Sequence, residues 1–357
     1  MLGFDRRTAR YTWTVAVTVL VLCLVYLVRK TLFVFILALL FAYLLSPLVN
    51  LLDRVLPTNR TRPLALGLAY VIFVGAMALA ATQIGSRVVS QANAFAERFP
   101  QMLSKWETAS AAAPNTPFNS LKAQAIDKVR NGLAARSGDI LATLSKAGLK
   151  LLSVAGDLVY IVVIPILAFF FLKDARALRE HILDMVEDGP QRALLDDLME
   201  DVHLLLAHYM RALVLLSLAT FAAYSISFSI LGISYAVMLA ALAGILEFIP
   251  LLGPLTAAII ILIVSLISGA SAITVLIFIL SYRLFQDYVL SPQLMKRGVA
   301  LHPLLVLFGV FAGAEIAGIP GTFLSVPVMA LMRVVYVRFR KARIAAQLAP
   351  DGELIRS

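Results

Sequence analysis

The sequence predicts an all-α polytopic membrane protein, and three observations support that fold class. Of its 357 residues, 61% are hydrophobic, and the mean hydropathy is +0.90, well above that of a typical soluble domain. Many windows of roughly 15 to 22 residues carry no charged side chain, which is long enough for a membrane-spanning helix. Two further apolar stretches are interrupted by proline and glycine, which predicts re-entrant hairpins or broken spans.

We expect about eight membrane-embedded segments, of which six are full or nearly full spans. Arg6, Arg7 and Arg10 precede the first apolar run, as in a signal peptide, but no cleavage site of small residues follows. We therefore interpret that run as a retained span. In chain order, the six spans are Trp13–Val28, Thr31–Leu52, Pro63–Ile84, Leu151–Leu172, Ala212–Leu231 and Ala270–Leu290.

The two interrupted stretches are Ser234–Ile267, with its break at Pro250–Pro254, and Pro303–Tyr336, with its break at Gly318–Gly321. Each half is about 15 residues, or roughly 22 Å of helix, which is shorter than the hydrocarbon core of about 30 Å. Hairpins and broken spans both remain open. With hairpins, a span followed by a hairpin repeats in inverted topology, a recurring plan of transporters. The expected helix-break residues are Pro250, Gly253, Pro254, Pro292, Gly318, Pro320 and Gly321.

Basic residues suggest the orientation and explain much of the net charge of +10 without nucleic-acid binding. Arginines precede the first span, and the tail carries four basic residues without an acid. Both patterns place the termini in the cytoplasm. Residues 85–150 are basic and carry amphipathic helical faces, and we expect them outside. Lys173–His203 is acidic and inside, and its carboxylates are interpreted as a solvated face. The expected divisions are a three-span bundle (1–84), an amphipathic extramembrane segment (85–150), a fourth span with acidic helices (151–211), a transport core (212–336) and a basic tail (337–357).

Two isolated carboxylates are the leading candidates for a functional site. Glu247 is the only formal charge in the 71 residues between Arg211 and Arg283, and Glu315 is the only one between Arg297 and Arg333. A charge in hydrocarbon is costly and rarely lies there without a role. Each acid precedes a helix break, so a proton, or a small cation bound together with freed backbone carbonyls, could act there. A structural role, as a helix cap or an anchor in an aqueous vestibule, is the alternative.

Two further polar groups flank these acids. Arg283 and Asp287 are spaced i,i+4 and, with Gln286, predict an ion-paired cluster that is either a gate or solute contact, or an interfacial pair. A second group forms a stripe along one expected span, which suits a solute path or close helix packing. Its members are Ser217, Thr220, Tyr224 and Ser227.

Motifs of soluble enzymes are absent from the sequence. It contains no Walker phosphate loop, no HExxH zinc helix and no GxSxG elbow, and Cys23 is the single cysteine. We therefore expect no catalytic residues, no metal site and no cofactor.

The run from Glu247 to Pro254, Glu-Phe-Ile-Pro-Leu-Leu-Gly-Pro, resembles the signature of the AI-2E transporter family of bacterial inner-membrane proteins. The resemblance continues through Asp287–Pro292, Leu301–Leu304 and Ala317–Gly321 to Val326-Pro327, and it covers most of the chain. It implies export of the quorum-sensing signal autoinducer-2 or, as in some members, sodium(lithium)/proton antiport. It also implies a homo-oligomer.

The sequence and the resemblance together predict a secondary transporter that exports a small polar solute of the autoinducer-2 type. H⁺ or Na⁺ can provide the coupling. The expected partners are the lipid bilayer, the solute and the ion. Three alternatives remain: a monovalent cation/proton antiporter, a membrane scaffold or regulator that does not transport, and a passive oligomeric channel.

Overall fold

The computed structural model describes residues 6–56, 61–111, 158–294 and 301–348, and every element in these ranges is a helix. Six of the described helices are long and apolar enough to cross a membrane, and five of them coincide with expected spans. The prediction of an all-α polytopic membrane protein is confirmed. The expected span Leu151–Leu172 is described only from Leu158 onward; its first residues lie outside the described ranges.

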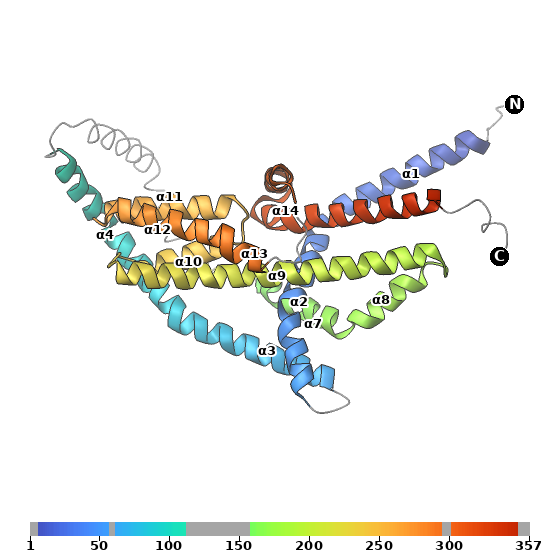
Figure 1. Cartoon of the computed structure of the whole chain (residues 1–357), viewed down its shortest axis with the longest axis horizontal. Coiled ribbons are helices and arrows are strands. Elements are labelled where there is room, and N and C mark those ends of the chain that lie inside the picture. The colour runs from blue at the N-terminus through green and yellow to red at the C-terminus, as the bar shows by residue number, and fades with distance from the viewer. Residues whose placement is uncertain (1–5, 57–60, 112–157, 295–300, 349–357) are drawn as a thin grey trace.

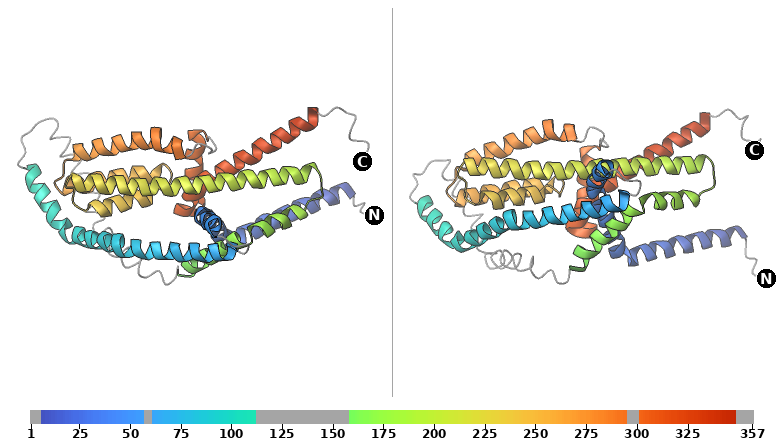
Figure 2. Two further views of the ribbon diagram at one scale, coloured as in Figure 1. Left: turned by 60° about the horizontal axis from the view of Figure 1, so that its bottom comes forward. Right: turned by 90° about the horizontal axis from the view of Figure 1, so that it is seen from below.

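The N-terminal part of the chain forms a small helical bundle (Figure 1). Its core consists of side chains from α2, α3 and α7, among them Leu45, Leu66 and Ala168. Helix α1 is exposed over its described side chains and projects away from this bundle (Figure 2). The elements are α1 (Arg6–Leu27), α2 (Arg29–Val55), α3 (Thr61–Ala80), the π-turn η1 (Ala81–Gly85), α4 (Ser86–Ala111) and α7 (Leu158–Lys173).

Helix α4, in the segment 85–150, buries one face against the downstream helices, and the extramembrane position of this segment stays a prediction. Phe95 and Phe99 are buried, and the Phe95 ring meets the Tyr235 ring edge-on at 5.3 Å. The Gln91 side-chain oxygen accepts a hydrogen bond of 2.9 Å from the backbone N–H of Met238, in the first turn of α10. Helix α4 therefore covers one end of the downstream helices. The second expected amphipathic stretch lies outside the described residues.

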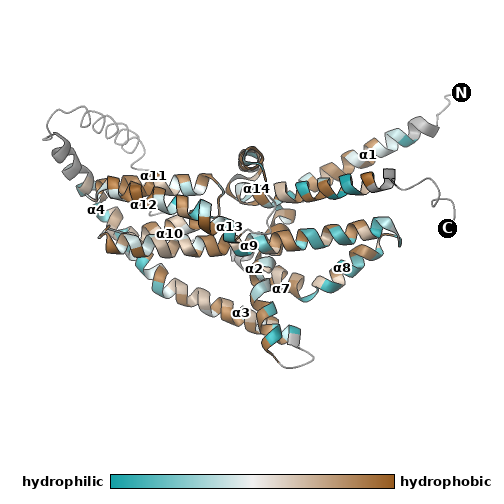
Figure 3. Cartoon of the chain, in the orientation of Figure 1, coloured by the Kyte–Doolittle hydropathy of each residue, from teal (hydrophilic) through white to brown (hydrophobic). Residues whose placement is uncertain are grey.

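The remaining helices surround α9, which has 41 residues and is about 60 Å long, twice the thickness of a hydrocarbon core. Its C-terminal half is apolar, and its polar N-terminal half extends beside α8 and the end of α14 (Figure 3). The elements are α8 (Ala175–Asp184), α9 (Pro190–Ile230), α10 (Ala236–Leu246), α11 (Leu252–Ile267), α12 (Ala272–Phe285), the π-turn η2 (Gln286–Leu290), α13 (Ser291–Leu294) and α14 (Pro303–Leu348).

The first interrupted stretch is a helical hairpin, α10 followed by α11. The two helices have 11 and 16 residues, about 16 and 24 Å, so neither spans the hydrocarbon core alone. At the tip, Leu251 has φ 64° and ψ −57°, and the N–H of Leu252 donates to the carbonyl of Pro250 at 2.7 Å. This geometry is a γ-turn of the rare, strained kind. Proline and the γ-turn together reverse the chain within five residues.

The second interrupted stretch is also a hairpin, because α14 contains two arms. Ala317 and Gly318 are non-helical, with Gly318 at φ 64° and ψ −142°. A Cβ placed on Gly309 would lie 2.8 Å from Cγ of Met329, twenty positions away, so the arms run back beside each other. The expected break at Gly318–Gly321 thus begins one residue earlier, and Pro320 and Gly321 lie within the second arm.

Both hairpins pack on α9. Leu324 and Ala330 of α14 share a buried cluster with Leu205 and Leu206 of α9, and α10 packs along the apolar half of α9. The Phe248 ring, next to Glu247, lies 6.2 Å from the Phe323 ring of α14. The two hairpins therefore meet beside one helix. Their entry from opposite faces of a membrane stays a prediction.

The polar half of α9 carries ion pairs along two sides, and its carboxylates remain partly exposed, as expected for a solvated face. Arg338 of α14 contacts Asp201 and Asp197 at 2.5 and 2.8 Å. Arg179 of α8 lies 2.6 Å from Asp196 and 3.9 Å from Glu200. Carboxylates at i and i+4 share one face of α9, so each arginine meets two of them.

Replacing Arg338 with Gln is expected to lower the melting temperature only slightly, and only at low salt. Exposed ion pairs contribute about 0–1 kcal/mol each and are screened by salt. The measurement is thermal unfolding of the detergent-solubilised protein at two salt concentrations. A loss of stability that persists in high salt would contradict this electrostatic account.

Candidate functional site

Glu247 lies at the tip of the first hairpin, near the middle of the apolar bundle. Thr220, its neighbour on α9, is ten residues before the helix end at Ile230 (220 to 230), about 15 Å away. Tyr282 is ten residues after the start of α12 at Ala272 (272 to 282). Helix α10 itself has 11 residues. Three helices thus place the carboxylate about 15 Å from one end of the bundle, or half of a hydrocarbon core of about 30 Å.

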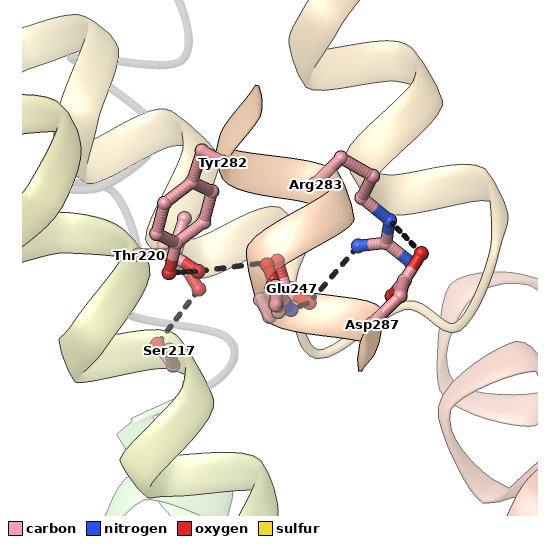
Figure 4. Close-up of polar contacts among 8 residues, drawn as sticks. Ser217, Thr220, Glu247, Tyr282, Arg283 and Asp287 are labelled. Atoms are coloured by element: carbon pink, nitrogen blue, oxygen red, sulfur yellow. Dashed lines mark hydrogen bonds and ion pairs between the residues drawn. The ribbon is translucent and has the colours of Figure 1, made fainter. Parts of the chain in front are cut away.

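The Glu247 side chain is only 9% exposed and is held by three neighbours (Figure 4). Its Oε1 accepts a hydrogen bond of 2.5 Å from the Gln286 amide, and it lies 3.6 Å from NH1 of Arg283. Its Oε2 accepts a longer bond of 3.5 Å from the Thr220 hydroxyl. These side chains come from α9, α12 and η2, so the site exists only where the hairpin tip meets both neighbouring helices.

The π-turn η2 places Gln286 and Asp287. The N–H of Ser291 donates to the carbonyl of Gln286, five residues back, which widens the helix at this point. Pro292 follows directly and has no N–H to continue an α-helical ladder. Single π-turns within helices are frequent at functional sites. Gln286 is 2% exposed, so its amide is committed to the buried carboxylate.

The expected i,i+4 ion pair between Arg283 and Asp287 is present. Nε of Arg283 lies 3.1 Å from Asp287, and both side chains are partly exposed, at 39% and 48%. NH1 of Arg283, in contrast, is buried and has no hydrogen-bond partner. It faces Glu247 at ion-pair distance but beyond hydrogen-bond distance. With Glu247 ionised, the two acids and one arginine carry a formal charge of −1.

Two buried hydroxyls satisfy Glu247 in either protonation state. The Thr220 and Tyr282 oxygens lie 3.0 Å apart, and either can donate. With an ionised carboxylate, Tyr282 donates to Thr220 and Thr220 donates to Glu247. With a protonated one, Glu247 can donate to Thr220, and Thr220 to Tyr282. Because hydroxyls rotate at little cost, this pair offers Glu247 a donor when the carboxylate is ionised and an acceptor when it is protonated.

The stripe of hydroxyls on α9 contributes to packing as well as to the site. Ser217 donates to the carbonyl of Gly244 at 2.7 Å, where α10 lies close against α9. Tyr224 is buried among the rings of Phe228, Phe278 and Tyr282. Of the four residues, Thr220 contacts Glu247, while Ser227 is partly exposed. The stripe therefore takes part in close helix packing, and its role as a solute path stays a prediction.

Glu315 is not brought to Glu247 within the described chain. It is exposed near the turn of the second hairpin, next to the exposed side chains of Ile316 and Ile319. No contact joins the two acids in the described residues, and a central site shared by both stays a prediction. Tyr282, which the sequence did not single out, is instead part of the site. Its position one turn before Gln286, next to Arg283, was the available signal.

The chain is similar over most of its length to proteins assigned to one transporter family. A model described as the AI-2E family transporter matches residues 15–341. YrrI of Bacillus subtilis is 26% identical over 324 residues, covering 89% of each chain. A Mycobacterium tuberculosis protein is 27% identical over 340 residues, covering 91% of this chain and 88% of its own. PerM of Escherichia coli is 26% identical over 320 residues, covering 87% and 88%. The first two are named as candidate transport proteins, and PerM is named as a candidate permease.

Proposed function

This chain belongs to the AI-2E transporter family, and we propose that it is a secondary transporter of a small polar solute in which Glu247 carries the coupling proton or cation. Export of a molecule of the autoinducer-2 type fits the family description. The proposal includes a bacterial inner membrane, cytoplasmic termini and a homo-oligomer. The observation that carries it is the burial of Glu247 halfway through the apolar bundle, with polar partners for both protonation states.

Transport at this site requires movement, because Glu247 is enclosed by packed helices. A solute or ion can reach the carboxylate only if the first hairpin separates from α9 or α12. The hairpin has a strained γ-turn at its tip and two short arms, and it meets the second hairpin through Phe248 and Phe323. Strained backbone is found where a conformational change is part of the mechanism. These features support alternating access by motion of the two hairpins.

Replacing Glu247 with Gln is expected to abolish coupled flux, because the amide carries no charge that a proton or a cation can neutralise. Glutamine keeps the size of the side chain but cannot exchange a proton. Autoinducer-2 flux and the collapse of an imposed pH gradient are measured together in proteoliposomes. A matched control is Glu97→Gln, on the exposed side of α4, which is expected to transport normally. Unchanged coupled flux in Glu247→Gln would remove this residue from the mechanism.

A monovalent cation/proton antiporter is the second candidate, and the formal charge of −1 at the site favours it. A site of one arginine and two carboxylates is neutralised by one bound proton or one Na⁺. Sodium-dependent proton release from vesicles without any organic solute would select this function. Saturating flux of an organic solute would select the solute transporter. Steady conductance without saturation would select a passive channel. A scaffold or regulator would show no flux in any of these assays.

A further inference from the structure

The two contacts of Arg283 are unequal. Its Nε lies 3.1 Å from Asp287, while its NH1 is 3.6 Å from Glu247 and has no hydrogen-bond partner. A buried donor without an acceptor is unfavourable, so this NH1 gains from any shift that brings an acceptor closer. One guanidinium thus holds one carboxylate and faces another.

The two carboxylates differ in their other partners. Glu247 is buried and has Gln286 and Thr220 besides Arg283. Asp287 is about half exposed, so water satisfies its free oxygen. Arg283 can therefore leave Asp287 at little cost, whereas its distance from Glu247 decides whether a buried charge is compensated. Competition between the two acids for one arginine follows from this geometry.

We infer that Arg283 is an internal substitute for the transported cation: it moves toward Glu247 when the proton or cation leaves and returns to Asp287 when the ion binds again. This inference rests on the proposed function and deepens it, because it gives the site a way to avoid an uncompensated buried charge in its empty state. Asp287 is then the resting partner of Arg283, and it sets how strongly the arginine competes with the ion. Both are positioning residues.

The inference predicts opposite effects for two neighbouring substitutions. In Asp287→Asn, Arg283 loses its resting partner and stays with Glu247, so a higher proton concentration is needed to protonate the carboxylate. In Arg283→Gln, the internal competitor is gone, and Glu247 is protonated at lower proton concentration. In the part of the chain that the structure describes, the other titratable groups near Glu247 are Tyr224 of α9 and Tyr282 of α12, and both substitutions leave them in place.

The test follows the protonation of Glu247 directly and does not depend on the identity of the solute. Dicyclohexylcarbodiimide modifies protonated carboxylic acids in apolar surroundings, and mass spectrometry of the purified full-length protein gives the labelled fraction of Glu247 at each pH. The pH midpoint of labelling is expected to fall by about one unit in Asp287→Asn and to rise by about one unit in Arg283→Gln, the lower end of the effect of a neighbouring charge. Arg283→Lys restores the positive charge and is expected to return the midpoint toward the wild-type value.

Arg192→Gln is the matched control, because Arg192 also pairs with an aspartate at i,i+4, Asp188, but on the polar part of the chain. It is expected to leave the labelling midpoint unchanged. Midpoints that move in the same direction in Asp287→Asn and Arg283→Gln, or that do not move, overturn the inference. If Arg283→Gln does not fold, the labelling midpoints of Asp287→Asn and Arg283→Lys are compared. A midpoint that is lower in Asp287→Asn supports the inference, and equal midpoints overturn it. The proposed function fails by a different result, unchanged coupled flux in Glu247→Gln, so the two failures are distinguishable.

Discussion

Replacing Gly253 with Ala is expected to destabilise the protein by about 3 kcal/mol or more, because the first hairpin cannot close around a methyl group. A Cβ at this position would overlap the backbone carbonyl of Leu246, and it would lie 3.2 Å from Cβ of Ile249. The Leu246 carbonyl belongs to the last turn of α10 and cannot rotate away as a side chain can. The two arms would have to separate at the tip, which carries Glu247.

The measurement is the melting temperature of the detergent-purified protein, together with coupled flux in proteoliposomes. We expect a large decrease in melting temperature and loss of flux, since the displaced tip removes Glu247 from Thr220 and Gln286. Gly67→Ala on α3 is the matched control: a Cβ there meets no atom within 4 Å. Alanine also favours a helix over glycine by up to about 1 kcal/mol. A melting temperature for Gly253→Ala equal to that of Gly67→Ala would show that the tip is not closely packed.

Replacing Gly321 with Ala is expected to open the second hairpin by the same mechanism. A Cβ on Gly321 would overlap the carbonyl oxygen of Gly313, and one on Gly313 would overlap that of Gly321. Each glycine thus allows the backbone of the opposite arm to approach. The expected cost is about 3 kcal/mol. Because Gly313→Ala strains the same contact, the double substitution should cost less than the sum of the two single ones.

Gly309→Ala separates this backbone contact from ordinary packing in the same hairpin. A Cβ on Gly309 would meet the Met329 side chain, which is flexible and can move aside. We therefore expect a decrease in melting temperature for Gly321→Ala and a much smaller one for Gly309→Ala. Similar decreases for both would contradict a hairpin closed by direct contact between backbones.

Local patterns predicted the helical class, five of the spans, the two interruptions and the ion pair of Arg283 with Asp287. Each of these depends on residues that are near one another in the chain: runs without charge, proline and glycine beside an acid, or a spacing of four in a helix. Hairpin and broken span could not be separated in this way, because both contain the same breaks. The approach of Gly313 to Gly321 and of Gly253 to Leu246 decides for hairpins.

The sequence by itself determined that this protein is a membrane-embedded helical protein with an acid placed at each of two helix breaks, since hydrophobicity and backbone restrictions act locally. Only the tertiary structure decided that the two acids differ. Glu247 is enclosed by Thr220 and Gln286, which are 27 and 39 positions away, whereas Glu315 is exposed. The same holds for the polar half of α9, where Arg338 crosses 137 positions to reach Asp201. Contacts between such distant residues depend on how whole helices pack, and a local sequence pattern does not predict which helices lie side by side.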